Sequence, residues 1–375
     1  MNRRQMLSNL TGFAAASGIV PALGCPESFA LGDDKPLSVS STGWITDVDG
    51  IEVGHWTSDR RPTGCTVILC RKGAIGGVDT PGGNPGSRLT DMLQPLRNAD
   101  ESVIVEAVVL TGGSDYGLAS ASGVERFLRE RYLEHHKSNP HPNPHVPIVP
   151  AAVIYDLYPE QDWTVVPTAE SGYAACQAAA KGKVAEGCVG AGAGAAIGHW
   201  GGHQTKSGLG TASFKVADTG VIVGAICAVN ALGDVYDPSN GKLVAGSRTA
   251  DGKDFAPILN RLRAGQDVKL PPPGTHTTIS CVATNANFNS AAMAKIAQMA
   301  SAAHARVINP AWAPGDGDTV FALSTGTLKT PIDHGAVGAI AADVLKEAIL
   351  RAVVNATSTA MLPSYREMVS ALRPK

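Results

Sequence analysis

Charge, aromatic residues and long apolar runs are all scarce in this sequence of 375 residues. Charged residues make up 17% of the chain, the net charge is −2, and no block of like charge occurs, so nothing indicates nucleic acid or an anionic membrane as a partner. Aromatic residues make up 5%, whereas there are 42 glycines, which favours close backbone approach over a bulky aromatic core. Apolar residues at 44% still indicate a folded globular protein.

Paired cysteines are also missing. None of the seven cysteines forms a C-x-x-C pair, so a zinc or iron–sulfur site is unsupported, and we predict neither a metal nor an organic cofactor. Most of them lie in apolar stretches typical of buried small side chains, although export would permit disulfides. The seven are Cys25, Cys65, Cys70, Cys176, Cys188, Cys227 and Cys281.

The N-terminus has the pattern of an export signal. Arg3-Arg4 precede a mildly apolar run, Leu10–Leu23, which ends in small residues around Ser28–Ala30. The paired arginines favour the twin-arginine route, and the run is too short to span a membrane. We therefore interpret residues 1–30 as a signal and predict a periplasmic or secreted protein without stable membrane insertion. A disordered cytosolic tail and a lipid-anchored Cys25 are the alternatives.

Strand-like and helix-like segments alternate through the remainder, without an internal repeat or an interior linker. Thr46–Val53 reads as a hairpin around Asp49-Gly50, Leu118–Glu134 as a helix, and Asn289-Ser290 as the cap of a second helix. The sequence predicts an α/β fold, a layered αββα-type sandwich, with residues 31–375 as a single domain.

The stretch from Pro271 to Phe288 carries the most chemical information. A loop of three prolines and a glycine ends abruptly at a strand that begins with Thr277. A threonine hydroxyl becomes a useful nucleophile when a base takes its proton, and its own α-amine is such a base once the preceding peptide bond is cut. The loop Pro271–Gly274 can hold that bond in a strained geometry. The plain alternative is a threonine that favours a β-strand.

Nine segments in order make the sequence similar to a known family. Together they resemble the L-aminopeptidase/D-esterase family of N-terminal-nucleophile hydrolases, which includes β-peptidyl aminopeptidases and nylon-oligomer hydrolases. The segments are ITDVDGIEVGHWT, TGCTVIL, VDTPGGNPGSRLTDML, VVLTGGSDYGLAS, VPIVPAAVIYDL, VGAGAGAAIG with KSGLGTAS, VGAICAVNALGDV, HTTISCVATNA and GDGDTVFALSTG, from Ile45 to Gly326.

This resemblance implies a chain that cleaves itself before Thr277. Residues 31–276 would become a large α chain and residues 277–375 a small β chain, with Thr277 as the nucleophile. It also implies a homo-oligomer of αβ units and a small peptide or amide as substrate. His276 stands where relatives tend to carry Asn or Gly, and its imidazole can either assist the cleavage as a base or slow it by its bulk.

The resemblance assigns roles to further residues. Asp316 and Asp318 would support the nucleophile, and the amide of Asn230 would donate to an oxyanion. In both places the alternative is a turn, which Asp, Gly and Asn favour. Lys206 would stabilise negative charge, although Ser207 replaces the usual glycine beside it. Tyr155 is the candidate for a second oxyanion donor, with Tyr158 as the neighbouring alternative.

Three functions follow from these patterns. The first is an exported, self-processing hydrolase of amide bonds that releases N-terminal residues from short peptides or related amides. The second keeps the nucleophile but transfers the acyl group to an amine, as in ornithine acetyltransferases, and an export signal disfavours it. The third is a non-catalytic binding protein that retains the fold but not the cleavage.

Overall fold

The computed structural model describes residues 43–94, 102–158, 162–266 and 272–372. The predicted signal, Cys25 and Pro271 lie outside these ranges. Within them, no helix has the length and apolarity needed to cross a bilayer. The six cysteines of the described chain are all free, and all but Cys188 are buried. The prediction that most cysteines are buried small side chains is therefore confirmed.

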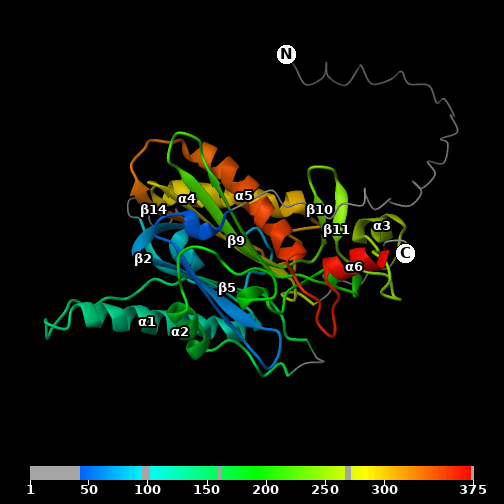
Figure 1. The fold of residues 1–375 in the computed structure, drawn as a ribbon, viewed down its shortest axis with the longest axis horizontal. Coiled ribbons are helices and arrows are strands. Elements are labelled where there is room, and N and C mark those ends of the chain that lie inside the picture. The colour runs from blue at the N-terminus through cyan, green and yellow to red at the C-terminus, as the bar shows by residue number, and fades with distance from the viewer. Residues whose placement is uncertain (1–42, 95–101, 159–161, 267–271, 373–375) are drawn as a thin grey trace, which may run out of the picture. The chain divides into compact units, whose positions relative to one another are not determined.

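A mixed nine-stranded sheet forms the centre of the protein (Figure 1). The strands run in the order β3-β5-β4-β2-β14-β12-β9-β8, and β1 pairs with β2. Their bounds are β1 Glu52–Thr57, β2 Gly64–Asp79, β3 Ser87–Arg88, β4 Ile104–Thr111, β5 Ala151–Val153, β8 Leu209–Lys215, β9 Ile222–Asn230, β12 Thr277–Ala286 and β14 Thr319–Leu328.

Two smaller sheets flank this one. The first has the order β11-β10-β13, and the second pairs β6 with β7. Their bounds are β6 Ala196–Ile197, β7 Thr205–Lys206, β10 Asp234–Asp237, β11 Lys242–Ala245 and β13 Ile308–Asn309.

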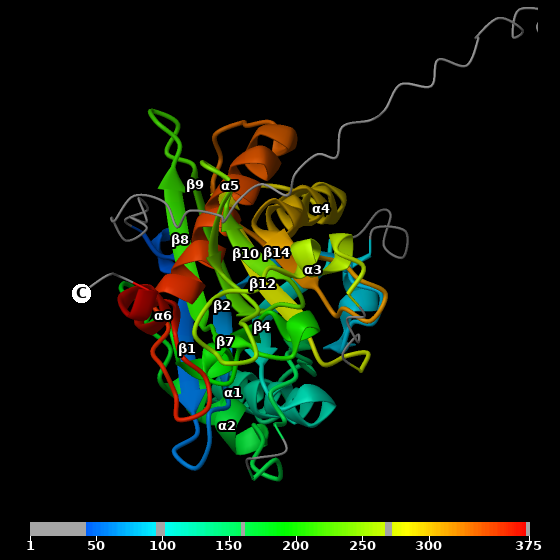
Figure 2. The same ribbon diagram turned by 90° about the vertical axis from the view of Figure 1, so that its right-hand side faces the viewer.

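Six α-helices and several short 3-10 turns complete the described chain. In both views α4 and α5 lie on one side of the strands and α1 and α2 on the other (Figures 1 and 2). The helices are α1 Ala119–His135, α2 Ala169–Gln177, α3 Ile258–Arg263, α4 Ser290–Val307, α5 His334–Val354 and α6 Tyr365–Leu372.

Alternation along the strands creates the layers. Ile279, Cys281 and Ala283 of β12 belong to a core cluster that also holds Ile68 of β2 and Val108 of β4, so the two halves of the sheet face each other. The opposite side chains of β12 and β9 pack with α4 and α5, and those of β2 and β4 pack with α1 and α2. The order is therefore helices, strands, strands and helices, as the sequence predicted.

The β12–α4–β14 crossover unit brings Thr277 close to the residues that precede β14. β12 runs into α4, whose cap Asn289 accepts a hydrogen bond from the backbone N–H of Ala292, and the chain returns through β14, parallel to β12. Parallel strands place their N-terminal ends at the same edge, so Thr277 and the residues just before β14 come together there.

The predicted hairpin at Thr46–Val53 is wrong. Ile45–Asp47 forms a 3-10 turn, and β1 pairs with β2 instead of with the preceding residues. Val48 and Ile51 are both fully buried, so this segment is fixed by the core between the two sheet halves. In a two-stranded hairpin, Val48 and Ile51 would not both face the core.

Candidate active site

Thr277 begins β12 directly opposite Asn230, the last residue of β9. Its side chain is almost fully buried, and its hydroxyl donates a hydrogen bond of 2.5 Å to the carbonyl oxygen of His276. The backbone N–H of Gly317 donates to the same carbonyl at 3.3 Å. The carbonyl oxygen of the peptide bond predicted to be cut therefore accepts hydrogen bonds from both the Thr277 hydroxyl and the Gly317 N–H.

Asp316 and Asp318 form a buried acidic pair beside this bond. Asp318 Oδ1 accepts the N–H of Thr278 at 2.5 Å, and Asp316 Oδ1 accepts the N–H of Gly317 at 3.0 Å. Burial and the adjacent Asp318 carboxyl raise the pKa of Asp316 well above its usual range. A pKa of about 9 means that Asp316 keeps its proton at neutral pH and can act as an acid.

Gly317, between the two acids, allows this close approach. A Cβ atom at that position would lie 2.4 Å from Oγ1 of Thr277. The loop that connects β2 to β3 covers the same segment, because the N–H of Asn84 donates to Asp316 O at 2.7 Å. Glycine at position 317 is therefore required by the packing of Thr277 against the acidic segment.

The orientation of the Asn230 amide is set by its neighbours. Its Oδ1 accepts hydrogen bonds from the N–H of Ala196 and from Nε2 of His199, each at 3.0 Å. Its NH₂ group therefore faces two backbone carbonyls, that of Tyr155 at 3.1 Å and that of Thr275 at 3.5 Å. The amide thus contacts the segment that leads into β12, two residues before Thr277.

His199 is held in turn by Gln204, whose Nε2 lies 3.2 Å from Nδ1 of the imidazole. Burial lowers the pKa of His199 to about 4, so the ring is neutral at pH 7. Because Nε2 faces an acceptor oxygen, the proton of the neutral ring is on Nε2. Neither His199 nor Gln204 was predicted from the sequence.

Lys206 and Tyr155 are connected to Asn230 through backbone groups rather than through direct contacts between side chains. The buried ammonium of Lys206 donates to the carbonyls of Gly192, Ala195 and Ser207, and burial lowers its pKa. It thereby anchors the glycine-rich turn that presents the Ala196 N–H to Asn230. Tyr155 contributes its carbonyl to Asn230, whereas the hydroxyl of Tyr158 is engaged by Gly194 O at 3.3 Å. The catalytic roles suggested for Lys206 and Tyr155 stay predictions.

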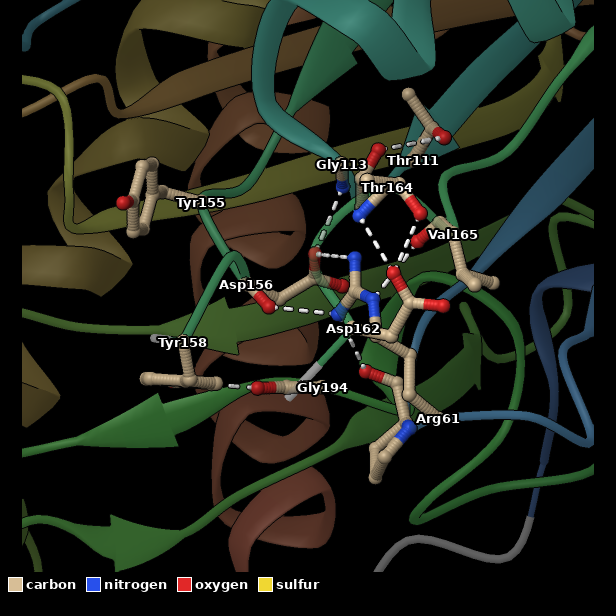
Figure 3. A network of polar contacts seen from close by, with 12 residues as sticks. Arg61, Thr111, Gly113, Tyr155, Asp156, Tyr158, Asp162, Thr164, Val165 and Gly194 are labelled. Carbon is tan, nitrogen blue, oxygen red and sulfur yellow. Dashed lines mark hydrogen bonds and ion pairs between the residues drawn. The ribbon is translucent and has the colours of Figure 1, made fainter. Parts of the chain in front are cut away.

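A buried ion pair supports the residue after Tyr155. Arg61 lies 3.1 Å from Asp156, and their side chains are 2% and 0% exposed. The guanidinium also donates to the carbonyls of Val165 and Asp156, while the N–H of Gly113 donates to the carboxylate. Figure 3 shows the ring of Tyr155 turned away from this pair.

Two further histidines lie near the acidic pair. Burial lowers the pKa of His276 to about 4, so its ring is a neutral base at pH 7. His304 of α4 is fully buried; its Nε2 lies 2.9 Å from Oγ of Ser280 and its Nδ1 lies 3.6 Å from Oδ2 of Asp318. In the described parts of the chain, no three acidic, histidine or cysteine side chains are grouped as metal ligands.

The model of peptidase family S58 matches residues 44–364, which include every element of this site. The chain belongs to peptidase family S58. An uncharacterized aminopeptidase of Mycobacterium bovis is 41% identical over 349 residues, covering 86% of this chain and 97% of the relative. A 6-aminohexanoate-oligomer endohydrolase of a Kocuria species is 31% identical over 334 residues, covering 84% and 88%.

Solved structures agree on the fold. A β-aminopeptidase of a Burkholderia species has a TM-score of 0.64 and 23% identity, covering 89% of this chain and 97% of that one. An L-aminopeptidase D-Ala-esterase/amidase of Ochrobactrum anthropi, described as a variant of the Ntn hydrolase fold, has a TM-score of 0.65 and 20% identity, covering 90% and 96%. The S58 chain is thus an amide-bond hydrolase with an Ntn-type fold, and the predicted resemblance and fold class are confirmed.

Proposed function

We propose that this S58 hydrolase cuts its own chain between His276 and Thr277 and then acts as an aminopeptidase through the new N-terminal threonine. The observation that carries the proposal is the position of the Thr277 hydroxyl, 2.5 Å from the carbonyl oxygen of the bond to be cut. A second donor, the N–H of Gly317, contacts the same oxygen and is placed to stabilise the negative charge that develops there.

Self-cleavage requires the proton of the hydroxyl to reach the leaving nitrogen. As Thr277 Oγ attacks the carbonyl carbon of His276, the ionised member of the acidic pair takes the hydroxyl proton. The protonated member gives a proton to the amide nitrogen, so the C–N bond breaks and an ester to Oγ remains. Water then hydrolyses the ester, which leaves a carboxylate on His276 and a free amine on Thr277.

Cleavage supplies the two groups that turnover needs. The α-amine of Thr277 titrates near neutrality and can take the hydroxyl proton during attack on a substrate. Departure of the segment that contains Thr275 also frees the NH₂ hydrogen of Asn230 that faces its carbonyl. The amide of Asn230 and the N–H of Gly317 would then serve as oxyanion donors for the substrate carbonyl.

The substrates proposed are short peptides with a free N-terminus and related amides. Names of relatives at 41% and 31% identity include an aminopeptidase and a 6-aminohexanoate-oligomer endohydrolase. Membership in a peptidase family favours transfer of the acyl group to water over the acetyltransferase and non-catalytic alternatives. Export and assembly of αβ units stay predictions from the sequence.

Intact mass spectrometry of the purified protein tests the cleavage. We expect two fragments, one of which begins at Thr277 and ends at Lys375, and a single uncut chain for Thr277→Ala. Thr278→Val is the matched control, because its buried hydroxyl has no hydrogen-bond partner in the described chain and it should cleave normally. A wild-type chain that stays intact would remove the base on which the mechanism depends.

A substrate panel tests the activity of the cleaved enzyme. Aminoacyl p-nitroanilides with α-, β- and 6-amino groups, each with an N-acetylated partner, separate the substrate classes. We expect release of p-nitroaniline only from the compounds with a free amine. Equal rates on the acetylated partners would indicate an amidase rather than an aminopeptidase.

A further inference from the structure

His304 is a buried titratable group outside the nucleophile, the acidic pair and the oxyanion donors. It lies near the end of α4, which runs back along β12 and so brings the imidazole beneath the start of that strand. The two ring nitrogens face different partners, Ser280 Oγ at 2.9 Å and Asp318 Oδ2 at 3.6 Å. Nδ1 has no hydrogen-bond partner within the described chain, although it is buried beside a carboxylate.

The neighbours of the ring select one tautomer. The hydroxyl of Ser280 can donate to Nε2, and a neutral ring then carries its proton on Nδ1, directed at the carboxylate. The other tautomer would place a nitrogen lone pair opposite a carboxylate oxygen in a dry environment, which is repulsive. At 3.6 Å the contact is longer than a hydrogen bond but is strongly electrostatic away from water.

We propose that His304 is a positioning residue that keeps the negative charge of the acidic pair on Asp318, while Asp316 holds a proton. The two oxygens of Asp318 support this division, because Oδ1 accepts the N–H of Thr278 and Oδ2 faces His304. The backbone N–H groups of Gly317 and Ala313 approach the carboxyl of Asp316. What distinguishes the two carboxyls is the imidazole, because it faces Asp318, and a donor directed at a carboxyl favours its charged form.

The consequence reaches the scissile bond through a chain of four side chains, Ser280, His304, Asp318 and Asp316. The charged and titratable groups that face the acidic pair are His304 from α4 and His276 from the segment before β12. His304 does not contact the reacting atoms. It sets which carboxyl takes the proton of Thr277 and which one gives a proton to the leaving nitrogen, and this role rests on the proposed self-cleavage.

Two substitutions of His304 distinguish a hydrogen-bond donor directed at Asp318 from a side chain that only fills the core. The amide nitrogen of His304→Asn lies near the position of Nδ1 and keeps a donor toward Asp318. His304→Gln instead keeps a polar group near Nε2 and Ser280. We expect His304→Asn to cleave within about threefold of wild type and His304→Gln to slow by roughly tenfold or more, with a shifted pH profile of the cleavage rate.

The outcomes are decisive in either direction. Faster cleavage in His304→Gln than in His304→Asn, or equal rates in both, would overturn the proposal. A thermal melt of each variant in the uncut Thr277→Ala chain shows whether it folds. Should a variant fail to fold, the tautomer in the Thr277→Ala chain decides the question.

That tautomer is measured without any activity. Long-range ¹H–¹⁵N correlation of the histidine side chains identifies which nitrogen of His304 is protonated, with the His304 signal assigned by its loss in a variant. A proton on Nδ1 supports the proposal, and a proton on Nε2 alone overturns it. Because the Thr277→Ala chain does not cleave, this result is separate from success or failure of the proposed function.

Discussion

Asp156 and the pair Asp316–Asp318 are all buried, but they differ in what surrounds them. Asp156 faces the guanidinium of Arg61 and the N–H of Gly113. Burial raises its pKa, and the charge of Arg61 acts in the opposite direction. Asp316 instead faces another carboxyl, which adds to the effect of burial on its pKa.

This difference suits the two clusters to different roles: the Arg61–Asp156 pair stabilises the fold, and the Asp316–Asp318 pair can exchange a proton. Opposite charges with fixed backbone partners hold the segment after Tyr155 in one conformation, and no proton has to move there. A carboxyl that keeps its proton beside a second carboxyl places an acid next to a candidate base, at some cost in stability. Both clusters are coupled to Asn230, the first through the carbonyl of Tyr155 and the second through the start of β12.

Removing charge from the acidic pair should have the largest effect on chemistry. Asp318→Asn keeps an oxygen for the N–H of Thr278 but can no longer take the proton of Thr277. We expect self-cleavage to slow by about a hundredfold or more, with unfolding free energy unchanged or higher because a neutral amide replaces a buried carboxylate. Band conversion on denaturing gels and chemical denaturation measure the two effects. Cleavage at the wild-type rate would assign the base elsewhere.

Removing one partner of the ion pair should have its largest effect on stability. Arg61→Met leaves the carboxylate of Asp156 buried without its counter-charge, which costs roughly 3–5 kcal/mol. The matched control is Arg60→Met. Arg60 and Asp162 pair at 2.8 Å but are 67% and 48% exposed, so the loss of this ion pair should change the unfolding free energy far less. Urea denaturation compares them, and equal losses would contradict the structural assignment of Arg61.

Much of this site was predictable from sequence, because its central residues lie at the ends of strands with clear patterns. The apolar run that ends at Asn230 and the run that begins after His276 each mark a strand, and their pairing brings Asn230 opposite Thr277. The resemblance supplied the remaining step, the association of Asp316 and Asp318 with that strand edge.

The supporting residues were missed because their partners are distant in sequence. His199 lies in a glycine-rich segment that reads as a loop, and Arg61 lies between two strands without any local pattern. His304 carried a usable signal, since it falls on the same helical face as Ala297 and Ala300, which are buried, and Val307. A histidine on the apolar face of α4 is expected to have a buried polar partner. In the structure, His304 faces Ser280 and Asp318.

The raised pKa of Asp316 also predicts a pH dependence of stability. The pKa of Asp316 is raised in the folded chain, so the folded state binds this proton more tightly than the unfolded state does. The unfolding free energy therefore falls as pH rises above the ordinary carboxyl pKa of about 4, by about 1.4 kcal/mol per pH unit, until the raised pKa is passed. In the uncut Thr277→Ala chain, adding Asp316→Asn should remove this contribution.

Denaturation of both chains between about pH 5 and pH 8 isolates the difference, because every other titrating group is common to the two. The stability of the Asp316→Asn chain relative to its parent should increase with pH. A constant difference would mean that the pKa of Asp316 is not raised in the folded chain.

His199, a neutral side chain hydrogen-bonded to Asn230, should affect the reaction rate through the direction of its hydrogen bond rather than through charge. His199→Gln can keep a donor at the position of Nε2 toward Asn230, whereas His199→Asn cannot. We expect near wild-type kcat for the first and a loss of about tenfold for the second, since a misoriented amide no longer donates to the oxyanion. Neither variant should alter the pH profile near neutrality, because the pKa of His199 is lowered to about 4. A shifted pH profile would show that the ring of His199 titrates during turnover, so that His199 acts through its charge and not only through the direction of its hydrogen bond.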